Sequence, residues 1–143
     1  MTDQLKFFSE EWCAAALAAH EGELAAREAK AVKDPANFDH IIAFEVTDRP
    51  DLVTHLEYVG ARAASWRSAD AANLFDEDRV WARFRGKAEH FREAAEGRTP
   101  AANLVMAGKV RLVKGTMKDA IENAQALNII LRAWGDLPTG WDV

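Results

Sequence analysis

The alternation of side-chain types at residues 79–85 constrains the fold of this chain more than any other feature. Apolar Val80, Ala82 and Phe84 alternate with Arg79, Trp81, Arg83 and Arg85. Successive side chains of a β-strand point to opposite faces of a sheet. The pattern therefore predicts a strand with one buried face and one solvent-exposed, largely basic face. Other parts of the chain must then cover one face of a sheet.

A helical pattern precedes this strand. Ser9 is a good N-cap residue, and Glu10 and Glu11 suit the positive end of a helix dipole. Apolar side chains then recur at helical spacing as far as Leu24. The helix is expected to end before Pro35, because a residue that precedes proline avoids the helical region.

Another helix is predicted at the end of the chain, from about Met117 to Ala133. Thr116 is its expected N-cap and Gly135 its stop. Its second half is apolar on nearly all sides, so it needs cover from several directions. The helix therefore lies in the core, forms a wall of a ligand cavity, or contacts another subunit. The sequence leaves these three alternatives open.

Strands and short helices occupy the rest of the chain. Strands are expected at residues 38–46, 52–58, 62–67 and 109–114, and short helices at 87–95 and 100–106. In the second of these strands Leu52, Leu56 and Tyr58 share one face, whereas His55 and Glu57 share the other. We expect a single α+β domain over residues 1–143.

The segment GRTPAANLVMAGKVRLVKG, at residues 97–115, is followed by TMKDAIENAQAL. This order of a glycine, a proline, a short apolar helix, a Gly-Lys step, a strand, a glycine and a final helix resembles the C-terminal signature of the sterol carrier protein type 2 family. The matching positions are Gly97, Pro100, Gly108, Lys109, Gly115 and Met117. The resemblance is specific over about residues 79–131 and looser over 1–78. Family members often have Gly-Asp or Gly-Asn before the last helix, where this chain has Gly115-Thr116.

The resemblance implies an α+β fold with a five-stranded, mostly antiparallel sheet. Helices cover one face of that sheet, and an apolar tunnel lies between sheet and helices. In the family this tunnel takes sterols, fatty acids or fatty acyl-CoA esters. We therefore expect a domain that binds, and in some members transfers, a hydrophobic small molecule or lipid. Neither an enzymatic activity nor a cofactor is expected.

The expected ligand-binding residues are mostly apolar and lie in the first strand and in the second half of the chain. Methionine suits adaptable apolar sites, and a single amide among apolar residues suits a ligand hydroxyl or carboxylate. Asn128 is that amide, although a partly wet polar residue of the core explains it equally well. The full set is Phe44, Leu104, Met106, Val110, Leu112, Met117, Ile121, Ala124, Asn128 and Leu131.

No catalytic or metal-binding motif is evident. The histidines lack metal-ligand spacing, and nucleophile-elbow and phosphate-binding glycine motifs are absent from the sequence. His20 is expected to be hydrogen-bonded and semi-buried, and Cys13 to be a small buried hydrophobe. A pair of His55 and Glu57 on one strand face stays open as a weaker catalytic alternative.

Composition restricts the partners and the location. The net charge of −5 argues against a general nucleic-acid binder. No apolar run reaches the roughly 20 residues of a membrane-spanning helix, so at most transient membrane contact is expected. The start of the chain has no basic and apolar signal regions, which favours the cytoplasm. A homodimer stays open.

The competing functions are a small α+β enzyme of cyclase or isomerase type, and an interaction domain that uses the last helix.

Overall fold

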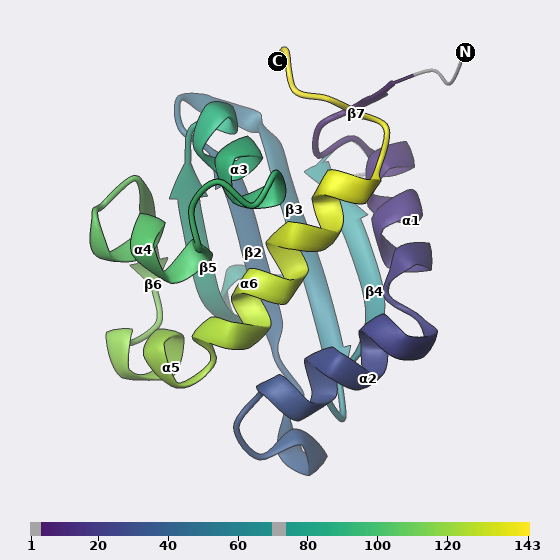
Figure 1. The fold of residues 1–143 in the computed structure, drawn as a ribbon, viewed down its shortest axis with the longest axis vertical. Coiled ribbons are helices and arrows are strands. Elements are labelled where there is room, and N and C mark those ends of the chain that lie inside the picture. Colours follow the sequence, from purple (N-terminus) through teal and green to yellow (C-terminus); the bar gives the residue numbers. More distant parts are fainter. Residues whose placement is uncertain (1–3, 70–73) are drawn as a thin grey trace.

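The computed structural model describes residues 4–69 and 74–143. Residues 1–3, which contribute to the expectation that no signal segment is present, lie outside this range. Figure 1 shows a layer of helices packed on one face of a sheet. The helices are α1 (Glu10–Ala19), α2 (Gly22–Ala31), α3 (Ala88–Ala95), α4 (Ala101–Met106), α5 (Met117–Glu122) and α6 (Ala124–Ala133).

The main sheet has five strands in the order β4-β3-β2-β5-β6. They are β2 (Ile41–Val46), β3 (Arg49–Val59), β4 (Arg62–Ser68), β5 (Val80–Gly86) and β6 (Val110–Lys114). All neighbours are antiparallel except β2 and β5, which are parallel. The predicted α+β class, with a mostly antiparallel sheet under helices, is confirmed. Near the chain ends, β1 (Leu5–Lys6) and β7 (Thr139–Gly140) pair in parallel.

Two helices that the sequence predicts as continuous are each broken. The first divides into α1 and α2 around residues 20–21, and the last divides into α5 and α6 at Asn123. The Asn123 side chain donates a hydrogen bond to the Asp119 carbonyl at 2.9 Å and accepts one from the Lys33 N–H at 2.9 Å. Such side-chain bonds compete with the helix for backbone partners. The predicted N-caps Ser9 and Thr116 are confirmed, at 3.2 and 3.1 Å.

A β-bulge in β5 overturns part of the predicted alternation. Ile41 pairs with Val80, but the next residue of β2 pairs with Ala82, so Trp81 is the extra residue. The expectation that Val80 shares a face with Ala82 and Phe84 is therefore wrong. Val80 packs with Ile41 on the face opposite the helices, whereas Ala82 and Phe84 belong to the main core. An inserted residue reverses the side-chain direction in this way, and it brings Trp81 against the main core.

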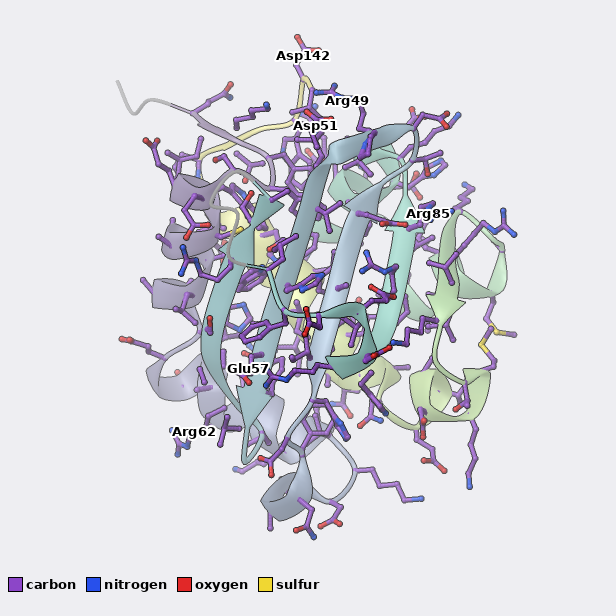
Figure 2. The ribbon with its side chains drawn as sticks, turned by 180° about the vertical axis from the view of Figure 1, so that it is seen from behind. Arg49, Asp51, Glu57, Arg62, Arg85 and Asp142 are labelled. Carbon is purple, nitrogen blue, oxygen red and sulfur yellow. The ribbon has the colours of Figure 1, made fainter. Side chains whose placement is uncertain are left out.

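The face of the sheet without helices carries paired charges (Figure 2). Glu45 accepts hydrogen bonds from both Arg83 and Arg85, and Arg83 also binds Glu77. The side chain of Arg83 is consequently only 14% exposed. The expected solvated basic face is wrong at this residue, because acidic side chains of β2 and of the segment before β5 cover it.

His55 is buried on the same face, at 2% exposure. Its ring lies parallel to that of Phe75, with ring centroids 6.5 Å apart. Among the described residues, neither ring nitrogen has a hydrogen-bond partner. Burial, helped by the positive charge of Arg83, lowers the pKa of His55 to about 4. The alternative His55–Glu57 pair does not form, since Glu57 instead binds Arg79 at 3.1 Å.

The lowered pKa of His55 predicts a loss of stability in mild acid. Between pH 6.5 and 4 the unfolded chain takes up a proton at this residue more readily than the folded one, so the free energy of unfolding falls as the pH falls. His55 alone should account for about 2–3 kcal/mol between pH 7 and pH 4.5. Urea unfolding at both pH values should show a smaller difference for His55→Leu than for the wild type. His90→Gln is the control, and an unchanged difference in His55→Leu would contradict the assignment.

Candidate functional site

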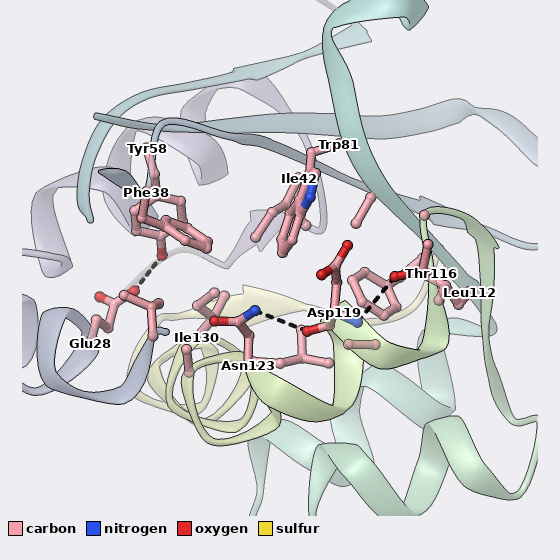
Figure 3. A pocket seen from close by; sticks show the side chains of 17 residues that line it. Glu28, Phe38, Ile42, Tyr58, Trp81, Leu112, Thr116, Asp119, Asn123 and Ile130 are labelled. Carbon is pink, nitrogen blue, oxygen red and sulfur yellow. Dashed lines mark hydrogen bonds between the residues drawn. The ribbon is translucent and has the colours of Figure 1, made fainter. Parts of the chain in front are cut away.

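A mostly apolar pocket lies between the sheet and helices α2, α5 and α6 (Figure 3). It encloses about 520 Å³ that protein atoms do not fill, and part of this space is open to solvent. Its large apolar walls are Val32, Phe38, Ile42, Trp81, Phe84, Leu112, Leu127 and Ile130.

Small residues on the facing elements create this space. Ala82 on β5 faces Ala120 and Ala126 of the two last helices across the pocket, and Gly115 lies at its edge. Gly115 has a φ of 103°, and a Cβ atom there would come within 3.0 Å of the Trp81 carbonyl oxygen. A larger residue at this position is therefore excluded by both backbone and contact. The pocket exists because these small residues leave space between the larger side chains of the helices and the sheet.

The closed end of the pocket holds a buried carboxylate. Glu28 of α2 is only 2% exposed. One of its oxygens binds Nδ1 of His20. The other accepts a hydrogen bond from the Tyr58 hydroxyl, which Figure 3 shows. Burial, followed by the nearby Glu28, raises the pKa of Tyr58 well above its usual value, so this hydroxyl keeps its proton. A buried carboxylate is tolerated because it has such partners. His20 is thus hydrogen-bonded, as predicted.

A second carboxylate lies towards the open end. Asp119 of α5 is half-buried, and Figure 3 shows its side chain directed into the pocket, towards Ile42 and Trp81. His40 stacks on the indole of Trp81 with ring centroids 4.2 Å apart. Burial lowers the pKa of His40, although the charge of Asp119 acts in the opposite direction. Thr116, at this end, is exposed.

The ten residues predicted from the sequence occupy three different environments. Leu112 lines the pocket. Four others line a separate shallow groove between α4 and α5–α6, which encloses about 280 Å³ including open space: Met106, Met117, Ile121 and Ala124. Met106 is 72% and Ile121 59% exposed. The structure thus brings these four side chains together, on the outer side of α5.

The remaining five predicted residues have structural surroundings. Phe44, Leu104, Val110 and Leu131 are buried in the main core. The amide oxygen of Asn128 accepts a hydrogen bond from the Ala101 N–H at 3.0 Å, which holds the start of α4. Cys13 is also fully buried, as expected of a small hydrophobe.

Sequence reasoning missed the polar end of the pocket. Glu28 and Tyr58 were not among the predicted site residues, although Glu28 follows His20 by eight residues within a predicted helical segment. Residues eight apart share a helix face, so this spacing is the signal that was available. Because α1 and α2 are separate helices, however, the contact between His20 and Glu28 depends on how these two helices pack.

The described residues also bear on metal and membrane binding. In residues 4–69 and 74–143, no group of three or more His, Cys, Asp or Glu side chains is arranged to hold a metal ion. None of the helices in the described part of the chain combines the length and the apolar character needed to cross a membrane.

Comparison with known proteins identifies the fold. Neither a family model nor a curated protein sequence matches the chain. Solved structures do match. A crystal structure of sterol carrier protein 2 has a TM-score of 0.71 and 19% identity, over 91% of this chain and 98% of that one. The solution structure of a conserved hypothetical protein from Thermus thermophilus has a TM-score of 0.72 and 18% identity, over 97% and 94%.

A third structure, apo sterol carrier protein 2 from Yarrowia lipolytica, has a TM-score of 0.52 and 17% identity, over 95% of this chain and 99% of that one. The chain therefore has the fold of sterol carrier protein 2, and the resemblance predicted from residues 79–131 is confirmed at the level of fold.

The buried carboxylate predicts a coupled loss of stability. Tyr58→Phe removes a donor from Glu28 and should lower the free energy of unfolding by about 1–3 kcal/mol, because a buried carboxylate oxygen loses its partner. The same change in a Glu28→Leu background should cost much less, since no carboxylate remains. Urea denaturation of the four proteins of this cycle measures the coupling. Equal losses in both backgrounds would show that the hydroxyl does not stabilise Glu28.

Proposed function

We propose that this protein binds a hydrophobic small molecule or lipid in the pocket between the sheet and helices α2, α5 and α6. The observation that carries the proposal is the pocket's construction: large apolar walls, small residues that leave space, and a few polar groups. Ligand sites for apolar molecules are built in this way. The likeness to solved sterol carrier proteins supports the same function.

Ligand entry requires a movement, because the space is narrow. The volume open to the centres of water molecules is only about 30 Å³, so a lipid has to push the walls apart. We propose that α5 moves. This helix has six residues, none of them buried, and Asn123 separates it from α6. A segment with few buried contacts opens at low cost.

The groove on the outer side of α5 is an alternative position for the ligand, and it is the position that the sequence predicts. Ala120 and Leu127 line both the pocket and the groove. Movement of α5 would therefore join the two spaces into one apolar passage, as the expected tunnel requires. The exposed Met106 and Ile121 beside it suit brief contact with a membrane surface during lipid transfer.

We infer binding rather than catalysis. The polar side chains at the closed end are engaged with one another, Glu28 with His20 and Tyr58, and they face apolar walls. This arrangement supports recognition of one polar group on a largely apolar ligand. We further propose that residues 1–143 act as one domain in the cytoplasm.

Two alanines of α6 test where the ligand lies. Ala126 lines the pocket, whereas Ala124 lines the groove. Ala126→Phe should weaken binding of the fluorescent sterol dehydroergosterol at least tenfold, about 1.4 kcal/mol, because phenylalanine fills the pocket. Ala124→Phe is the matched control and should bind nearly as the wild type does. Circular dichroism and thermal melting establish that both variants fold.

Two results would contradict the placement. Loss of binding in Ala124→Phe alone would move the ligand to the groove. Absence of dehydroergosterol binding, together with absence of binding of long-chain alcohols and acids to the wild type, would refute the lipid-binding function itself.

A further inference from the structure

The charges that line the pocket are all negative. Glu28 and Asp119 contribute carboxylates, and among the described residues no lysine, arginine or histidine lines it. Proteins usually hold a carboxylate or phosphate through arginine, lysine or clustered N–H donors. Among the described residues, then, no lysine or arginine of the pocket wall can pair with an anionic head group.

The basic residues nearby form ion pairs with acidic residues outside the pocket. Arg83 and Arg85 of β5 bind Glu45 on the opposite face of the sheet, so the sheet itself separates them from the pocket. On the helix side, Lys33 binds Glu122 at 3.1 Å on the exposed surface. These pairs lie outside the pocket, where Glu28 is bound by His20 and Tyr58 and Asp119 lies at the half-buried open end.

The closed end nevertheless has capacity for one more hydrogen bond. Each carboxylate oxygen has two acceptor sites, and each Glu28 oxygen has one partner, either His20 or Tyr58. Both partners hold the carboxylate in a fixed orientation at the end of the apolar walls. A hydrogen bond made there is strengthened, because little water competes and the local dielectric constant is low.

Building on the proposed function, we propose that the pocket selects a lipid whose polar group is an uncharged hydroxyl, and that Glu28 accepts the hydrogen bond of this hydroxyl. The apolar body of the ligand then extends between the sheet and α6 towards Asp119. A lipid with a carboxylate head group is disfavoured, because it would place a second negative charge beside Glu28 where water cannot screen it.

Three fluorescent probes with one shared hydrocarbon body test the ligand class. They are 12-(1-pyrenyl)dodecanol, 12-(1-pyrenyl)dodecanoic acid and 1-dodecylpyrene, titrated below their aggregation concentrations against the full chain at pH 7.5. The alcohol should bind most tightly, and the acid at least tenfold more weakly. The hydrocarbon, which has no donor, should also bind more weakly than the alcohol.

Glu28→Gln tests the residue. Glutamine keeps the shape and can still bond to His20 and Tyr58, but it removes the charge. The preference for the alcohol over the acid should fall from at least tenfold to less than about threefold. Asp119→Asn removes the same charge from the half-buried open end and should reduce the preference less. If Glu28→Gln does not fold, the three probes on the wild type and the Asp119→Asn variant still decide the ligand class.

The outcomes separate this inference from the proposed function. An acid that binds the wild type as tightly as the alcohol overturns the ligand class while lipid binding stands. A hydrocarbon that binds as tightly as the alcohol overturns the role of Glu28 as hydrogen-bond acceptor. Absence of binding for all three probes and for dehydroergosterol refutes the proposed function.

Discussion

The packing of helices on one face of the sheet is the constraint on which the rest of the structure depends. Trp134, directly after α6, is central to it: its ring lies 5.2 Å from those of Trp12 and Phe44, and 5.7 Å from that of Phe91. These rings join the last helix to α1, to β2 and to α3. Aromatic contacts of this kind combine a large buried area with specific geometry. They hold α6 close to the sheet at one end.

Towards the other end of α6, the small side chains of Ala82 and Ala126 leave space between strand and helix, and the same packing leaves a pocket. The pocket is therefore a consequence of where large and small side chains fall along one helix and one strand. The bulge at Trp81 contributes a wall by turning an indole towards this space. Glu28 could not remain as a carboxylate among such walls without His20 and Tyr58, because a buried charge without partners is costly. The polar side chains at the closed end and the apolar space of the pocket thus come from adjacent parts of one core.

Much of the fold could be predicted from the sequence, because its signals are local. The N-caps Ser9 and Thr116, the strand character of β5 and the glycine that follows α3 each depend on residues a few positions apart. The candidate site was harder to predict from the sequence. Met117 and Ile121 lie one turn apart on α5, and helical spacing identifies such a pair, whereas Met106 lies beside them from α4. The pocket itself joins residues of α2, β3, β5 and α5, and local periodicity carries no information about which of these elements meet.

The sequence by itself determined the class of fold, the order of its elements and which residue types needed burial, since hydrophobic periodicity and capping act within single elements. Tertiary structure decided the rest. One inserted residue in β5 reversed the direction of Val80, and the register with β2 that reveals this bulge is a property of two strands. The breaks before α2 and α6 placed Glu28 opposite Tyr58 and Asp119 against the pocket. These contacts join residues distant in the chain, so their energies are set by packing between elements and not by the preferences of any one of them.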